Sequence, residues 1–303
     1  MLLRVLGTAA GGGTPQWNCA CPGCTGARRH PARRRLHDGL ALQPADPGAW
    51  FLANATPDIA GQLESHRTLL PDAGQERTPV VRVVLTDAEL DHTLGLLRIR
   101  EASRIEIWCT EPVRKALTTR LALDEVLSPY TALRWNDLPL TGAERPTDIG
   151  GLHVSAVPLS AKRPRYAAGE PAHPAWSVAL KVRDPATGKT ALYAPALASW
   201  SEPLEQEIAD SDCVLLDGTF LTDDEPPRTG FSRRTASAMG HLPVEGPNGT
   251  ASRLCGRGGK TGRRILYTHL NNSNPLGDPD DPAHERLAGL GLGVAADRMV
   301  VNL

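Results

Sequence analysis

The chain has 303 residues, and 33 Lys and Arg stand against 34 Asp and Glu, so that the formal net charge is −1. Without an excess of positive charge, we expect no nucleic-acid partner. The N-terminal apolar run is too short for a signal peptide and no apolar window is long enough to cross a bilayer, so we expect a cytoplasmic protein without a membrane partner.

Short apolar and β-branched runs predict strands along the whole chain. They cover residues 2–6, 50–52, 80–85, 104–109, 153–157, 176–182, 191–193, 213–216 and 265–267. Helical spacing predicts helices over residues 58–70, 93–102, 112–121 and 202–209. Polar, Gly-rich or Pro-rich stretches predict surface loops, some of them long enough to form active-site walls. They are residues 28–35, 71–79, 162–174, 223–234 and 246–264. The irregular mixture favours one layered α/β or α+β domain over residues 1–303 and does not fit a Rossmann fold.

Three cysteines, Cys19, Cys21 and Cys24, lie within six positions near the N-terminus. A bend at Pro22-Gly23 would let their thiolates converge on one tetrahedral Zn²⁺. The alternative is three free or oxidised thiols, but such close thiols without a metal are prone to oxidation. Without a neighbouring acid or base, we expect this zinc to be structural. The candidates for the fourth ligand are His30, His37, His284 and a side chain of the Asn-rich segment at 271–274.

Residues of the types that bind metals follow three of the predicted strands. Four of them come after the strand at 80–85, one after 213–216 and one after 265–267; they are Asp87, Glu89, Asp91, His92, Asp217 and His269. Strand ends that meet at one edge of a sheet would bring these side chains together, which predicts a metal site. For the first segment a helix cap is the alternative, because Thr86 and Glu89 match a capping box. His241 lies in a Gly-flanked loop, where a solvated side chain and a functional one are equally good interpretations.

Several longer stretches match one family. They are residues 6–13, 15–19, 54–58, 85–92, 216–220, 239–241 and 267–275. On these stretches the chain resembles the coenzyme PQQ synthesis protein B family from one end to the other. The segment from Asp87 to His92 is also similar to the His-x-His-x-Asp-His motif of the metallo-β-lactamase superfamily, with carboxylates in place of the first two histidines. The resemblance implies the four-layer αββα sandwich of that superfamily.

The resemblance also implies roles for individual residues. It implies a structural zinc on the cysteines, with Asn272 at the position of the fourth ligand of a related phosphodiesterase branch. It implies that Asp91, His92, Asp217 and His269 hold the active-centre metal. Asp87, Glu89 and His241 are then left to orient ligands or to transfer protons. Two histidines with a carboxylate and open positions are typical of non-haem Fe(II) sites, which predicts Fe²⁺ at the active centre.

The family is associated with an iron-dependent hydroxylation of the tyrosine part of a cross-linked Glu-Tyr precursor of the quinone cofactor. The resemblance therefore predicts a hydroxylase that takes O₂ and a small peptide or tyrosine-derived substrate. A metallo-hydrolase and a non-catalytic carrier of PQQ or its precursor are the alternatives. Arg163, Arg165 and Tyr166 are candidates for contact with a polyanionic substrate, although a solvated basic loop is the commoner case. The chain departs from the family pattern at residues 35–39 and 193–198, so another tyrosine-derived or peptide substrate of a natural-product pathway stays open.

Overall fold

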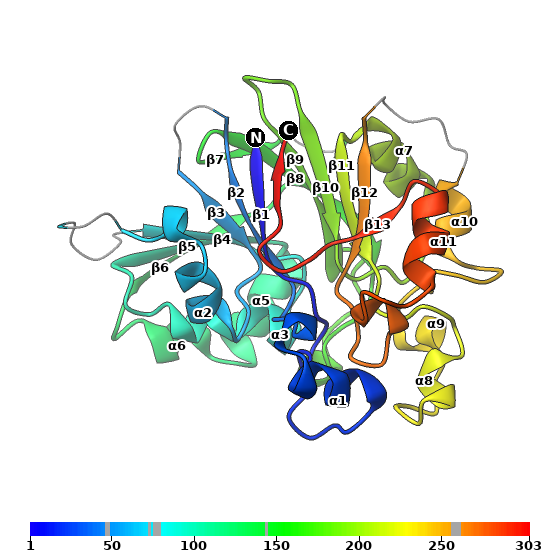
Figure 1. The fold of residues 1–303 in the computed structure, drawn as a ribbon. Coiled ribbons are helices and arrows are strands. Elements are labelled where there is room, and N and C mark those ends of the chain that lie inside the picture. Colours follow the sequence, from blue (N-terminus) through cyan, green and yellow to red (C-terminus); the bar gives the residue numbers. More distant parts are fainter. Residues whose placement is uncertain (46–48, 72–73, 75–79, 143–144, 256–261) are drawn as a thin grey trace.

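The computed structural model describes residues 1–45, 49–71, 74, 80–142, 145–255 and 262–303. In this part of the chain two seven-stranded sheets pack face to face (Figure 1). The first sheet has the order β14 (Val300–Asn302), β1 (Leu2–Gly7), β2 (Gly39–Gln43), β3 (Phe51–Ala53), β4 (Val80–Val84), β5 (Arg104–Cys109) and β6 (Ala132–Asp137). The second has the order β13 (Gly293–Val294), β12 (Arg264–Thr268), β11 (Cys213–Asp217), β10 (Thr190–Ala194), β9 (Ser177–Arg183), β8 (Leu152–Ser160) and β7 (Thr147–Ile149).

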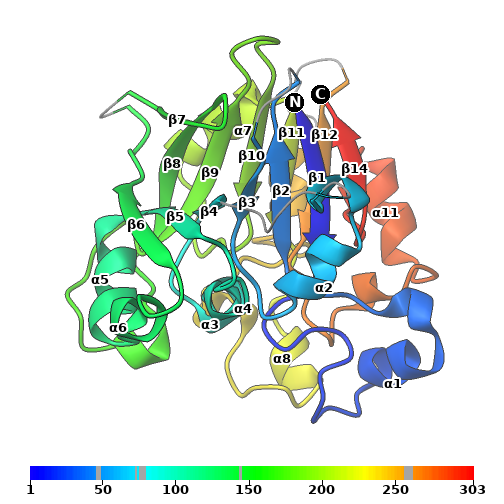
Figure 2. The same cartoon turned by 90° about the vertical axis from the view of Figure 1, so that its left-hand side faces the viewer.

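Helices cover the outer faces of both sheets (Figures 1 and 2). On the first sheet they are α2 (Ile59–Glu64), α4 (Gly95–Arg98), α5 (Glu111–Thr119) and α6 (Leu123–Leu127). The short helix α3 (Leu90–Thr93) lies between β4 and α4 in the chain. On the second they are α7 (Glu202–Asp210), α10 (Thr250–Leu254) and α11 (Ala283–Gly289). The end of the sandwich drawn at the bottom of Figure 1 carries α1 (Pro22–Arg29), α8 (Glu225–Arg228) and α9 (Ala236–Met239). The αββα sandwich expected from the resemblance is confirmed.

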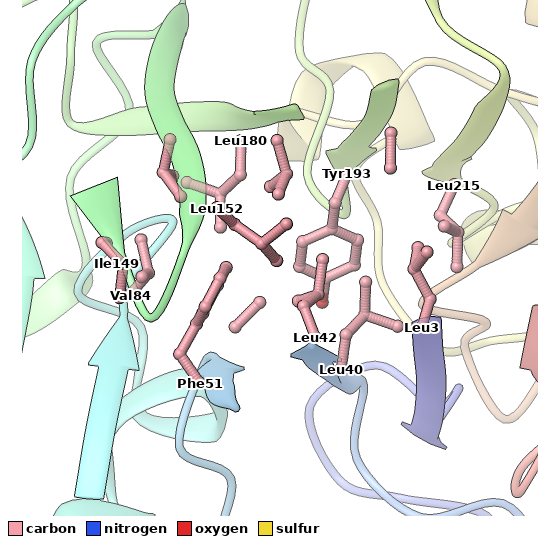
Figure 3. Close-up of a cluster of buried hydrophobic side chains, with 14 of the residues drawn as sticks. Leu3, Leu40, Leu42, Phe51, Val84, Ile149, Leu152, Leu180, Tyr193 and Leu215 are labelled. Carbon is pink, nitrogen blue, oxygen red and sulfur yellow. The ribbon is translucent and has the colours of Figure 1, made fainter. Parts of the chain in front are cut away.

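The main core lies between the two sheets. Leu40 and Phe51 of the first sheet and Leu180, Tyr193 and Leu215 of the second are all buried there (Figure 3). Burying one such large apolar side chain contributes about 1.5–3 kcal/mol of transfer free energy. The alternation of inward and outward side chains along each strand produces this layer. It also leaves the strand ends free to carry polar groups.

All the expected strands are present, but the sequence analysis missed β2, β6, β7, β13 and β14. The helix expected over 58–70 ends at Glu64 and is followed by a 3₁₀ turn at Arg67–Leu69. The one expected over 93–102 is shorter, because α3 ends at Thr93 and α4 covers only Gly95–Arg98. The expected bend at Pro22-Gly23 is wrong, because both residues belong to the first turn of α1. No described helix has the length and apolarity needed to span a membrane.

Candidate metal centre

The predicted metal-binding residues converge at one end of the sandwich because three strands end there. The segment 87–92, which runs into α3, follows β4, Asp217 is the last residue of β11, and His269 follows β12. His269 has a positive φ of 57°, a backbone conformation that costs free energy in a non-glycine residue and is often found at functional sites. The parallel pairing of β11 with β12 places Asp217 beside Thr268. The helix-cap alternative for Thr86 and Glu89 is wrong, since α3 begins at Leu90 without a side-chain cap.

Asp91, His92 and His269 form the first group of donors. Their donor atoms all lie within 4.8 Å of one another. The Asp91 Oδ2 atom is 3.8 Å from His92 Nε2 and 3.6 Å from His269 Nε2. His92 Nε2 is buried and has no hydrogen-bond partner, which is costly for a buried polar atom unless it has a ligand. Together with the His269 imidazole and the Asp91 carboxylate, this unpartnered nitrogen forms a donor set that fits a divalent cation.

Asp87 fixes the orientation of His92. Its Oδ2 lies 2.8 Å from His92 Nδ1, and it accepts hydrogen bonds from Thr86 Oγ1 at 2.9 Å and, on Oδ1, from the Glu89 backbone N–H at 2.9 Å. With Nδ1–H directed at Asp87, the His92 Nε2 lone pair points into the first donor group. Burial opposes the protonation of His92, but Asp87 and Asp91 outweigh it and raise the His92 pKa to about 10. The same field favours a bound cation.

Asp217, His241 and His269 form a second donor group that shares His269 with the first. Asp217 Oδ2 lies 2.7 Å from His241 Nδ1. Thr219 Oγ1 donates to Asp217 Oδ1 at 2.6 Å and lies 2.9 Å from His269 Nδ1. Asp217 was expected at the metal and His241 in proton transfer, and both belong to this second donor group. The sequence analysis missed Thr219, although the matched stretch 216–220 contains this residue.

Glu89 lies outside both donor groups and borders an open cleft of about 920 Å³. Burial, and then the neighbouring Asp87 carboxylate, raise the pKa of Glu89. The cleft walls come from the loop that begins at Lys162, from residues 234–240 and from Gly11 and Gly12. Of the five polar stretches expected as surface loops, 162–174 and, through Arg234, 223–234 contribute to this cleft. Parts of two others, residues 72–73, 75–79 and 256–261, lie outside the described residues.

The three cysteines form a separate cluster whose Sγ atoms lie within 4.8 Å of one another. Burial raises the pKa of the Cys21 thiol to about 11, so a divalent cation is needed to keep this sulfur as a thiolate at neutral pH. The Cys24 Sγ atom accepts a hydrogen bond from the Gln16 backbone N–H at 3.2 Å. Backbone donors of this kind hold the sulfurs in position for a metal.

Asn272 lies beside the cysteine cluster, as the resemblance implies. Its Nδ2 atom is 3.0 Å from Cys24 Sγ, and its Oδ1 atom is buried without a hydrogen-bond partner. Exchanging the amide oxygen and nitrogen would direct the oxygen at the sulfurs. Two histidine candidates are engaged elsewhere, since His37 pairs with Asp58 and His284 contacts the Leu276 carbonyl. Of the fourth-ligand candidates, Asn272 therefore has the observed contact with the thiols.

Comparisons with known proteins identify the family. A family model for the beta-lactamase superfamily domain matches residues 49–270. Coenzyme PQQ synthesis protein B of Azoarcus sp. is 40% identical over 307 residues, and that of Azotobacter vinelandii is 37% identical over 306; both alignments cover 100% of each chain. The chain belongs to the coenzyme PQQ synthesis protein B family. The resemblance inferred from the sequence is confirmed.

Solved structures agree with this membership of the coenzyme PQQ synthesis protein B family. Zinc-bound PqqB from Methylobacterium extorquens is 30% identical, with a TM-score of 0.89 and coverage of 100% of both chains. A diphosphatase of the PhnP family is 18% identical, with a TM-score of 0.66 and coverage of 100% of this chain and 97% of the other. The second similarity shows the shared fold alone.

Proposed function

We propose that this chain is a metal-dependent hydroxylase of PQQ biosynthesis, which uses O₂ to hydroxylate a small tyrosine-derived precursor such as a cross-linked Glu-Tyr unit. The observation that carries the proposal is the first donor group, Asp91, His92 and His269, beside an open cleft. Two imidazoles and one carboxylate are the ligand set of non-haem Fe(II) oxygenases. Fe²⁺ held there would activate O₂. The assignment to PQQ biosynthesis rests on the relatives, which are coenzyme PQQ synthesis proteins.

The residues of the chain then have distinct tasks. Asp87 holds the Nδ1 side of the His92 ring, so that Nε2 faces the cation, which displaces its proton. Thr219 holds His269 through its Nδ1 atom. Glu89 borders the cleft and has a raised pKa, so we assign to it the acceptance of the proton that the substrate phenol loses. His241 is neutral, since burial lowers its pKa, and it relays hydrogen bonding between Asp217 and the cleft.

A metallo-hydrolase is the second candidate, and the second donor group favours it. Asp217, His241 and His269 adjoin the first group through the shared His269. Two neighbouring cation sites are the arrangement with which hydrolases stabilise an attacking and a leaving oxygen. The carboxylates Asp87 and Glu89, which stand where a hydrolase of this superfamily has histidines, count against it.

The test is metal analysis and O₂ uptake after anaerobic loading with Fe²⁺, using a Glu-Tyr dipeptide and ascorbate as reductant. We expect substrate-dependent O₂ uptake that His92→Ala abolishes together with the iron, while the cysteine-bound zinc is retained. His153→Ala is the control, because His153 lies on β8 away from both donor groups. Two zinc ions with hydrolytic turnover and no O₂ uptake would establish the hydrolase. Tight PQQ binding without turnover would establish the carrier.

A further inference from the structure

Four cationic side chains line the cleft beside the first donor group. Lys162, Arg163 and Arg165 come from the loop after β8, and Arg234 comes from the loop before α9. Among the described residues, no carboxylate lies within 4.0 Å of any of the four, whereas basic side chains elsewhere, such as Arg33, Arg114 and Lys181, form such pairs. Two separate segments thus bring unpaired positive charge to one hollow, which differs from a basic loop that simply faces solvent.

Lys162 is held in a defined position. Its Nζ atom lies 3.4 Å from His241 Nε2, and the other ring nitrogen of His241 faces Asp217 at 2.7 Å. The carboxylate fixes the proton on Nδ1, so that Nε2 accepts a hydrogen bond from the lysine ammonium. The lysine stem crosses Gly240, where a Cβ atom would lie 2.7 Å from Lys162 Cδ. Gly240 also has a positive φ of 90°, so a glycine suits this crossing in both respects.

Charge also indicates what the cleft binds. Its inner end carries Glu89 and Asp91, which repel an anion unless cations at the wall compensate. Arg163 and Arg234 each donate to a backbone carbonyl, of Glu170 and Ala238 respectively, so their guanidinium groups are oriented and keep further donors for a ligand. Lys162, Arg165 and Arg234 remain exposed at the cleft.

We propose that Lys162, Arg165 and Arg234 bind carboxylates of the substrate, and that the cleft therefore selects a small molecule with at least two carboxylates. Of the three, Lys162 contacts a donor group directly, because its ammonium lies 3.4 Å from His241 Nε2. The inference rests on the proposed function only in taking this cleft as the substrate site. It names residues that determine specificity, beyond those that hold the metal.

The test compares two isosteric ligands, L-glutamyl-L-tyrosine and its diamide L-glutaminyl-L-tyrosinamide, by calorimetric titration of the zinc-loaded protein. We expect the wild type to bind the diacid at least about tenfold more tightly than the diamide, since a charged hydrogen bond contributes more than a neutral one. Lys162→Met should weaken binding of the diacid about tenfold and leave the diamide unchanged, and Lys162→Arg should retain most of the affinity. Lys189→Met is the matched control, because Lys189 precedes β10 at the opposite end of the sheet.

Equal affinity of the wild type for the two ligands, no measurable binding of the diacid, or no effect of Lys162→Met would overturn the proposal. Arg234→Met gives an independent second variant at an exposed position. Because zinc is redox-inert, the titration does not depend on oxygen chemistry. If the protein prefers the diacid but the iron-loaded form takes up no O₂, the carboxylate site is supported and the hydroxylase is refuted. If it takes up O₂ but binds both ligands equally, the hydroxylase is supported and the carboxylate site is refuted.

Discussion

His92 has one ring nitrogen bound by Asp87 and the other buried without a partner. We therefore expect Asp87→Asn to lower the zinc affinity of the first donor group by about 10- to 100-fold, the range seen when carboxylates that orient metal-bound histidines are removed. Competition with a chromophoric chelator measures this affinity. Glu89→Gln is the matched control, since Glu89 lies in neither donor group, and its affinity should equal that of the wild type. An equal loss in both variants would make Glu89 a direct ligand.

The protonation of His92 predicts a pH dependence of metal binding. Asp87 and Asp91 outweigh burial and raise the His92 pKa to about 10, so a cation must displace one proton from this ring at neutral pH. The apparent affinity should rise about tenfold per pH unit between pH 6 and pH 8, because binding releases one proton per ion. In Asp87→Asn the rise should be shallower, since the His92 pKa is lower without the carboxylate. A pH-independent affinity in the wild type would contradict this account.

At the scale of single residues, the sequence indicates the metal donors better than the residues that contact and position the site histidines. Asp91, His92 and His269 are conspicuous because each follows an apolar strand. Thr219 and Lys162 carry no such signal: a threonine two residues after an aspartate and a lysine in a basic loop are common. Their importance follows from contacts with His269 and His241, which only the packing of distant segments creates.

At the scale of elements, the junction between α1 and the loop after β12 brings the cysteine cluster and Asn272 together. A Cβ atom at Gly23 would lie 2.2 Å from the Asn272 carbonyl oxygen. Gly23→Ala should therefore destabilise the fold by about 1–3 kcal/mol and weaken zinc binding at the cysteines, as measured by urea denaturation and chelator competition. Gly61→Ala in α2 is the control, with nothing within 4 Å of the new Cβ and an expected stabilisation of about 0.5–1 kcal/mol. An unchanged zinc affinity in Gly23→Ala would show that the close packing of α1 against Asn272 does not position the cysteine ligands.

The same elements explain which parts of the fold the sequence could predict. Strands such as β4 and β11 are easily recognised, because valines occupy four of the five positions of β4 and β11 is apolar and buried up to its last residue, Asp217. The edge strand β6 is mostly exposed and contains Arg134, Asn136 and Asp137, so its composition is that of a loop. Helix α1 contains two glycines and is capped by Cys21, whose sulfur accepts the Cys24 N–H. Its stability comes from the cysteine cluster and not from helix propensity.

At the scale of the whole molecule, the contact between the two sheets ends in a polar group beneath the metal centre. Tyr193 of β10 donates its hydroxyl to Asp38 Oδ2 at 2.6 Å, and Asp38 immediately precedes β2 of the other sheet. The second Asp38 oxygen accepts the Thr268 hydroxyl, next to His269. Asp38 is fully buried, and burial raises its pKa. This carboxylate therefore joins the two sheets and the base of the site.

Replacing Tyr193 by Phe should test that link, because it leaves a buried carboxylate oxygen without its donor. We expect a loss of about 1–3 kcal/mol in the free energy of unfolding. A raised folded-state pKa for Asp38 means that stability falls as pH rises above the ordinary aspartate range. Loss of the Tyr193 hydroxyl raises that pKa further, so the loss should be larger at pH 8 than at pH 5. Tyr130→Phe, at an exposed tyrosine, is the control. The free energy of unfolding of both variants is measured by urea denaturation at pH 5 and pH 8. Equal losses in the two variants at both pH values would refute the link.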